Sequence, residues 1–208
     1  MEALMAFAAA LLALRLGGAL ATRWRTRRAP ELAAWSGSLL AYAVASAALA
    51  WGAAAGWDER AFRVYYLFGA LLTAPLLGLG SLLRIGWRWA IGPTLVYVGL
   101  AAGVAIAAPL HGEVSGSSIP EAQAHLDFFP ARLAAIAGNS LGTLAVVLVA
   151  IATFPRRPLG NSLVLAGVAT AALGSALAGL GEAETAVFVA AAAALLYAGF
   201  TARSRNSG

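Results

Sequence analysis

Seven apolar stretches, each long enough to cross a membrane as a helix, limit what this sequence can fold into. They cover approximately residues 3–22, 31–54, 62–83, 89–108, 130–154, 162–180 and 184–202. A transmembrane helix needs about 20 apolar residues, and none of the stretches alternates like a strand of a transmembrane β-barrel. The pattern predicts an all-α integral membrane protein, a seven-transmembrane-helix bundle that forms a single domain over residues 1–208.

The composition agrees with this prediction and excludes several kinds of chemistry. The chain is 61% hydrophobic and 11% charged, whereas soluble domains have about 25% charged residues. Because it has no cysteine, disulfides and thiolate metal sites are excluded. All cationic side chains are arginine, so no lysine can form a Schiff base. An Ala-, Gly- and Arg-rich composition is typical of a GC-rich genome, and we expect a multi-pass protein of a prokaryotic cytoplasmic membrane.

The arginines gather in alternate connections between the stretches. The connections that hold only basic charged residues are the first, third and fifth, together with the C-terminal tail: Arg23, Arg25, Arg27 and Arg28; Arg84 and Arg88; Arg156 and Arg157; Arg203 and Arg205. The other connections contain the acidic residues. Since arginine concentrates on the cytoplasmic side, we expect the N-terminus outside and the C-terminus in the cytoplasm. The six tryptophans fall near predicted helix ends, so we interpret them as interfacial anchors.

The longest connection, residues 109–129, contains a helix-start signal. In "SIPE", Ser118 and Glu121 have the spacing of a capping box. This predicts a short interfacial helix over about residues 119–127. Asp127 would then cap the following membrane helix.

Two segments resemble each other closely enough to suggest a repeat. "RRAPELAAWSGSLLAYAVASAALAWGAAAGWDER" and "RRPLGNSLVLAGVATAALGSALAGLGEAET" both begin with an Arg-Arg pair near a proline and end in glycine and acidic residues. Stretches one to three and five to seven would then form a 3+1+3 parallel repeat around the fourth. The alternative is that alanine-rich helices simply look alike.

The fifth stretch has a polar face. Arg132, Asn139 and Thr143 lie on one side of a helix. Asn139 facing lipid would leave its amide unsatisfied, which costs several kcal/mol, so this face should point into the bundle. It could contact a ligand, or it could form an interhelical hydrogen bond beside the small residues Gly138 and Gly142.

Three further residues are candidates for a binding site. Arg63 and Tyr66 lie near the outer end of the third stretch, where Pro75 predicts a kink. Arg15 lies about eight residues, roughly 12 Å, along its helix from Arg23. A cation within a membrane helix is costly, and it is read as a functional candidate by default.

The remaining motifs point away from most enzymes. His111 and His125 share the outer connection with acidic residues, but their spacing matches no metal-binding pattern. We therefore expect no metal and no cofactor, and we favour a non-enzymatic role over an enzymatic one. The positive charge is spread over four segments, which does not favour nucleic acid; membrane lipids are the expected partners. Gly99 and Gly103 could support a homo-oligomer.

The predicted topology, with the N-terminus outside, resembles that of rhodopsins and G-protein-coupled receptors, and the 3+1+3 arrangement resembles that of the sugar-transporting SWEET proteins. The lysine that holds retinal in a rhodopsin is absent from the seventh stretch, which reads "FVAAAAALLYAGF".

Three functions fit this sequence. The first is binding or transport of a small polar or anionic solute in an interhelical cavity lined by Arg63, Tyr66, Arg132, Asn139, Thr143 and Arg15. The alternative is a non-catalytic membrane sensor or assembly module, in which the polar residues only hold helices together. The third is a lipid-modifying enzyme that uses the outer connection.

Overall fold

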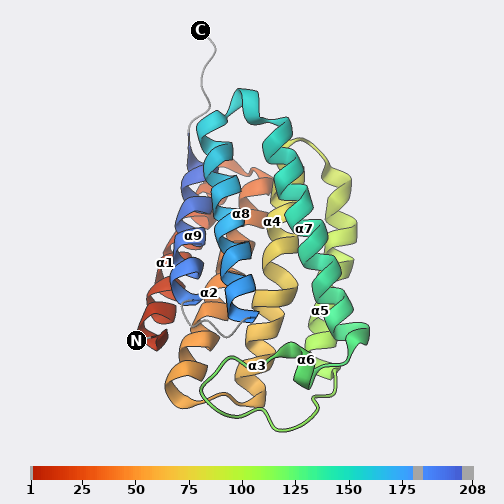
Figure 1. The fold of residues 1–208 in the computed structure, drawn as a ribbon. Coiled ribbons are helices and arrows are strands. Elements are labelled where there is room, and N and C mark those ends of the chain that lie inside the picture. The colour runs from red at the N-terminus through yellow and green to blue at the C-terminus, as the bar shows by residue number, and fades with distance from the viewer. Residues whose placement is uncertain (1, 180–184, 203–208) are drawn as a thin grey trace.

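The computed structural model describes residues 2–179 and 185–202, which form a bundle of helices running roughly along one axis (Figure 1). No strand occurs among these residues. The all-helical class predicted from the sequence is therefore confirmed.

The helices follow the predicted stretches closely. In chain order the elements are α1 (Glu2–Arg27), α2 (Pro30–Ala55), α3 (Glu59–Tyr65), the π-helix η1 (Tyr66–Leu72), α4 (Thr73–Arg84), the short η2 (Arg88–Ala90), α5 (Ile91–Ala107), α6 (Ala122–His125), η3 (Phe128–Arg132), α7 (Leu133–Ala152), η4 (Phe154–Arg156), α8 (Pro158–Gly179) and α9 (Thr185–Thr201). The third predicted stretch thus corresponds to α3, η1 and α4 in succession.

Five stretches of the described chain are long and apolar enough to cross a membrane. They are Ala3–Arg27, Pro30–Ala55, Glu59–Arg84, Arg88–Ala107 and Phe128–Ala152. In the last two helices the described apolar segments, Pro158–Gly174 and Ala190–Thr201, are shorter than these five stretches. The count of seven spans and the 3+1+3 repeat stay predictions.

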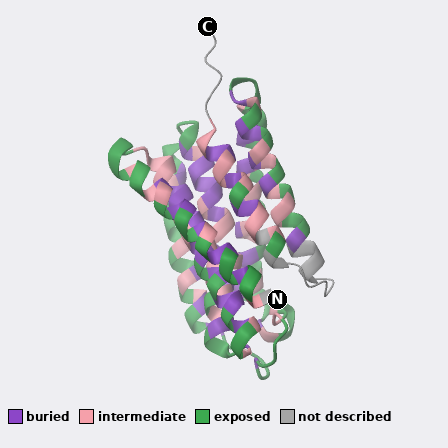
Figure 2. Cartoon of the chain, turned by 90° about the vertical axis from the view of Figure 1, so that its left-hand side faces the viewer, coloured by how far each residue is buried: buried purple, intermediate pink, exposed green. Residues whose placement is uncertain are grey.

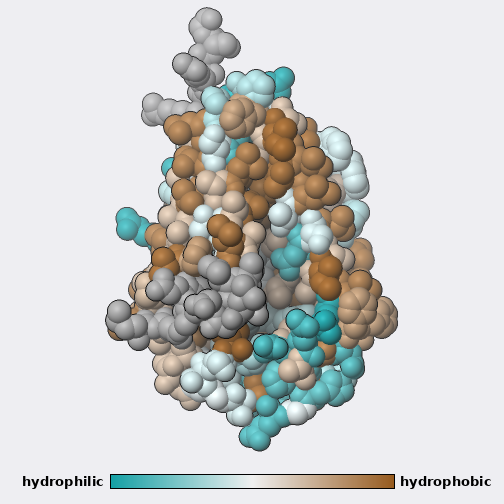
Figure 3. All heavy atoms as spheres, viewed as in Figure 1, coloured by the Kyte–Doolittle hydropathy of each residue, from teal (hydrophilic) through white to brown (hydrophobic). Residues whose placement is uncertain are grey.

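The outer surface of the bundle is apolar along the helices. On α5, Leu95, Val96, Leu100 and Ile106 are all more than half exposed. Figure 2 shows exposed residues on the outward sides of helices whose other sides are buried. In Figure 3 hydrophobic residues cover most of the visible face along the helices, and hydrophilic ones gather near the lower end. Such an extended apolar surface needs lipid to cover it, which is consistent with a multi-pass membrane protein.

Packing is organised around α2 and α4. α1 packs along α2 and α9, α4 lies between α2 and α7, and α8 pairs with α9. The α4–α7 crossing is very close, because a Cβ added to Gly142 would lie only 2.8 Å from the backbone nitrogen of Pro75. Glycine is required at this crossing since no side-chain atom fits between the two backbones.

The two ends of the bundle differ in charge. Arg84 and Arg156 line one cavity together with Glu31, which places the connections after α1, α4 and α7 at the same end. At the other end, the Trp57 amide donates to the Gly116 carbonyl at 2.7 Å, which joins the α2–α3 connection to the 108–127 connection. Figure 1 shows the α7–α8 connection at the upper end and the 108–127 connection at the lower end. We call these the basic end and the acidic end.

Two tryptophans are not interfacial anchors, so that interpretation was wrong for Trp35 and Trp57. Their exposed fractions are 2% and 4%. Trp35 stacks on Phe200 of α9, with ring centroids 4.3 Å apart, and Trp57 lies directly over Gly52. In both cases a neighbouring glycine makes room for the indole, which buries a large apolar area inside the bundle.

The helix predicted over residues 119–127 is shorter in the structure. Only Ala122–His125 is helical, and Glu121, not Ser118, occupies its N-cap position. Asp127 makes no side-chain cap to the following helix. Its carboxylate instead lies 3.1 Å from Nε2 of His111. This contact joins the two ends of the connection.

Candidate functional site

Arg63 links α3 to the last turn of α5 at the acidic end. Its Nη1 donates to the carbonyls of Ala105 at 2.8 Å and Ile106 at 3.2 Å, and its Nη2 lies 2.8 Å from Oε1 of Glu59. The two carbonyls belong to the last turn of α5, where a cation satisfies unpaired acceptors and complements the helix dipole. Most of this guanidinium's hydrogen-bonding capacity is therefore used inside the chain.

Tyr66 and Arg132 lie near the start of α7. The buried Tyr66 hydroxyl donates to the Ala131 carbonyl at 3.1 Å. The Arg132 guanidinium lies over the ring of Phe128, 5.8 Å from its centroid. Tyr66 and Arg63 both line a cavity of about 10 Å³, which is about the space that one water molecule needs.

Asn139 hydrogen-bonds to the π-helical segment of the neighbouring helix. Its Nδ2 donates to the Ala70 carbonyl at 2.6 Å and to the Ala135 carbonyl at 2.9 Å. Ala70 lies within the π-helix η1, five residues before Pro75. In a π-helix the carbonyl of residue 70 would accept from the amide of residue 75, but proline has no amide hydrogen. Ser38 and Thr73 satisfy two more carbonyls in this region. The polar side chains thus satisfy carbonyls in and beside the π-helical segment.

The remaining two predicted residues lie apart from these. Thr143 is half-buried one turn further along α7, and Arg15 is exposed on α1, which packs against α2 and α9. The structure therefore brings Arg63 and Tyr66 to one small cavity and places Arg15 on a different surface. The role of the six residues in ligand binding stays a prediction.

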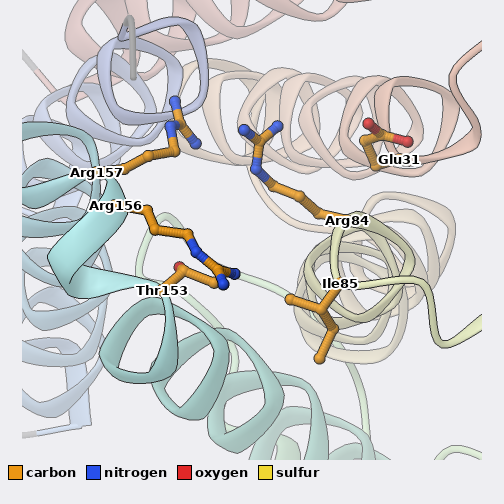
Figure 4. A pocket seen from close by; sticks show the side chains of 6 residues that line it. All are labelled: Glu31, Arg84, Ile85, Thr153, Arg156 and Arg157. Carbon is orange, nitrogen blue, oxygen red and sulfur yellow. The ribbon is translucent and has the colours of Figure 1, made fainter. Parts of the chain in front are cut away.

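A larger cavity, which the sequence does not predict, lies at the basic end. Its volume is about 530 Å³, and it is lined by Glu31, Arg84, Ile85, Thr153, Arg156 and Arg157. We call it the arginine pocket. Figure 4 shows the ends of Arg84 and Arg157 directed toward each other, with Arg156 extending into the same space. These side chains come from the ends of α2, α4 and α7 and from the turn before α8.

Arg157 is the buried member of the pocket, with an exposed fraction of 8%. Its Nη2 donates to the carbonyls of Gly199 at 3.2 Å and Ala202 at 2.5 Å, which caps the end of α9. Its Nε has no hydrogen-bond partner among the described residues. Burial lowers the pKa of the Arg157 guanidinium, and the positive charge of Arg84 lowers it further. Both causes disfavour the charged form, so a nearby anion would stabilise it.

Arg84 and Thr153 are also held in place. The Arg84 guanidinium lies 5.8 Å from the ring centroid of Trp35, which is itself fixed by its stack on Phe200. The Thr153 hydroxyl donates to the Val149 carbonyl at 2.7 Å and accepts from Nδ2 of Asn161 at 2.9 Å. The hydroxyl's donor is therefore used, and the guanidinium groups are the free donors around the cavity.

The two histidines of the 108–127 connection have a structural role. Nδ1 of His125 lies 2.9 Å from the His111 carbonyl, and the His111 amide donates to the His125 carbonyl at 2.9 Å. Among the described residues, no group of three or more His, Asp or Glu side chains is arranged to hold a metal ion. The histidines hold the connection together at its two ends.

The arginine pocket left only a weak signal in the sequence. In the sequence its arginines look like orientation charges, and Glu31 is the acidic residue that accompanies them at the start of α2. Comparison of the chain with protein-family models, with curated proteins and with solved structures gives no match.

Proposed function

We propose that this chain is a seven-span membrane protein, with its N-terminus outside, that binds a small anionic solute in the arginine pocket. The observation that carries the proposal is a cavity of about 530 Å³ with three arginines and a single acidic residue in its lining. A pocket of this size accommodates a small organic anion. An anionic solute is within the class expected from the sequence, a small polar or anionic one, but the arginine pocket lies at the other end of the bundle from Arg63 and Tyr66.

The electrostatics of the pocket favour an occupant with negative charge. Three guanidinium groups repel one another, and Glu31 compensates only one of their charges. One of the three, Arg157, is buried, and both its burial and the positive charge of Arg84 disfavour its charged form. An anion between them would relieve this repulsion and accept charge-assisted hydrogen bonds.

The pocket lies at the end that carries the basic connections. The positive-inside rule places this end in the cytoplasm, so the solute would enter from there. The π-helical segment η1, which lies within the continuous helix Glu59–Arg84, supports transport as a further step, because π-helical turns inside α-helices are frequent at functional sites.

A second function, a membrane assembly module, is favoured by a different observation. The polar groups of Asn139, Tyr66 and Ser38 all donate to backbone carbonyls of neighbouring helices. On this hypothesis the polar residues stabilise the bundle and bind nothing else.

Native mass spectrometry of the mildly solubilised protein tests the proposed function. Bound species would be released and identified from the wild type, from Arg156→Leu and from the matched control Arg88→Leu. Arg88 is exposed near the basic end and lies outside the pocket lining, so its replacement removes the same charge without altering the pocket. Arg157 is left intact because it also caps α9.

We expect a defined anionic species in the wild type and in Arg88→Leu, and its loss from Arg156→Leu. The same bound species in all three proteins would show that the pocket is not the site. That result would favour the assembly module.

A further inference from the structure

We infer that the arginine pocket recognises a phosphate monoester, the doubly charged group found on phosphorylated metabolites and on phosphatidic acid. This inference rests on the proposed function and specifies its ligand. Arg84, Arg156 and Arg157 with Glu31 leave two positive charges uncompensated in the lining. A phosphate monoester carries nearly two negative charges near neutral pH, so it matches this excess, whereas a carboxylate would neutralise only half of it.

The donors that remain free also point to this chemistry. The Thr153 hydroxyl donates its proton to the Val149 carbonyl, so the remaining polar side chains that can donate to a ligand are guanidinium groups. A guanidinium has only donors, arranged as a planar fork that matches the geometry of phosphate oxygens. The preferred ligand is therefore a group made only of acceptors, with enough oxygens to meet several forks.

Two of the guanidinium groups are fixed in position without a ligand. Arg157 is fixed by the carbonyls of Gly199 and Ala202 at the end of α9. Arg84 lies over Trp35, which is buried against Phe200. Holding the side chains in place reduces the entropy lost on binding. Arg156 is exposed and extends into the cavity from η4 (Figure 4), so it can close on the ligand from the open side.

Two sources could supply this group: a soluble phosphate ester from the cytoplasm, or the headgroup of a membrane lipid. The pocket lies at one end of the membrane-crossing helices, where both are available. The chemistry is the same in each case, and the experiment has one arm for each source.

The first arm measures binding of soluble probes to the protein in nanodiscs of neutral phosphatidylcholine. The probes are glycerol 3-phosphate, sulfate and acetate, titrated by calorimetry at about pH 5 and about pH 8. Because a phosphate monoester loses its second proton near pH 6, we expect glycerol 3-phosphate to bind about ten-fold more tightly at the higher pH. Sulfate should bind equally at both, and acetate more weakly than either.

Glu31 lines the pocket and could itself contribute to a pH dependence, so Glu31→Gln is the control for this arm. The variant should bind all anions more tightly, because it removes a negative charge, and it should keep the ten-fold effect. Arg156→Leu should weaken glycerol 3-phosphate binding at least ten-fold, and Arg88→Leu should leave it unchanged.

The second arm tests the lipid source. Nanodiscs would contain either phosphatidic acid, a phosphate monoester, or phosphatidylglycerol, a diester with a single negative charge. Native mass spectrometry then counts the lipids retained. Selective retention of phosphatidic acid that is lost in Arg156→Leu supports the lipid as the ligand, and binding in the first arm alone supports a soluble ester.

The possible failures can be told apart. If acetate binds as tightly as glycerol 3-phosphate, or if binding of the phosphate does not change with pH, the monoester inference is wrong while the anion site stands. If no anion binds in either arm and Arg156→Leu behaves as the wild type, the proposed function fails as well.

Discussion

The close crossing of α4 and α7 gives a sharp stability prediction. In Gly142→Ala, the new Cβ would lie 2.8 Å from the backbone nitrogen of Pro75 and closer still to the Ala74 carbonyl. Real Cβ atoms essentially never approach other atoms closer than 3.0 Å. Both neighbours are backbone, and the ring of Pro75 restricts φ, so neither can rotate away. The two helices must separate.

The size of the effect follows from this geometry. An ordinary van der Waals contact begins at 3.4 Å, so the helices must move apart by more than about half an ångström, which forfeits a large part of their dispersion contacts. Overpacking of this kind typically costs about 1–3 kcal/mol. The shift would also lengthen the hydrogen bond from Asn139 to the Ala70 carbonyl, which crosses the same interface.

The matched control is Gly103→Ala on α5. A Cβ added there meets no atom within 4 Å, so the same change of residue type should leave the free energy of unfolding unchanged or raise it slightly, since alanine favours a helix. Reversible unfolding in mixed detergent micelles, followed by circular dichroism, gives both values. Equal destabilisation by the two variants would refute the packing argument.

Three further predictions concern single side chains. Asn139→Leu should lower the free energy of unfolding by about 1 kcal/mol and leave sulfate binding unchanged in calorimetry, because Asn139 hydrogen-bonds to the π-helical segment and lies outside the pocket lining. Gly80→Ala should weaken sulfate binding several-fold, since its Cβ would displace Trp35, which supports an arginine of the pocket. His111→Ala and His125→Ala should leave lipid turnover unchanged in a radiolabel assay and change the unfolding free energy by less than about 1 kcal/mol, because the His111 pair is exposed.

The helix boundaries were predictable because apolar runs end where charged residues, glycine or proline appear. The stretch expected at 31–54 is α2, Pro30–Ala55, and the one expected at 89–108 is η2 with α5. The π-helix before Pro75 was predicted only as a kink. Its exact form depends on Asn139, which is far away in the sequence and satisfies a carbonyl of the widened turn.

The candidate site was less predictable, for two physical reasons. A sequence shows that Arg63 has donors, but it does not show that carbonyls of α5 already occupy them. The arginine pocket forms where the ends of separate helices pack together, and no local sequence pattern predicts which helix ends are neighbours. Arg84 and Arg156 are 72 positions apart in the chain and line one cavity.

The arginines of the pocket are also the residues from which the sequence predicts the membrane orientation. On that prediction, their replacement by leucine would disturb insertion as well as binding. Arg156→Lys separates the two roles. Lysine keeps the positive charge on which the predicted orientation depends, but it is a point charge without the planar fork. Because the chain has no cysteine, a single cysteine added at its C-terminus reports the orientation by labelling from either side. We expect unchanged orientation and several-fold weaker binding of glycerol 3-phosphate. Binding as tight as in the wild type would mean that the pocket recognises charge alone, and the argument from guanidinium geometry would be wrong.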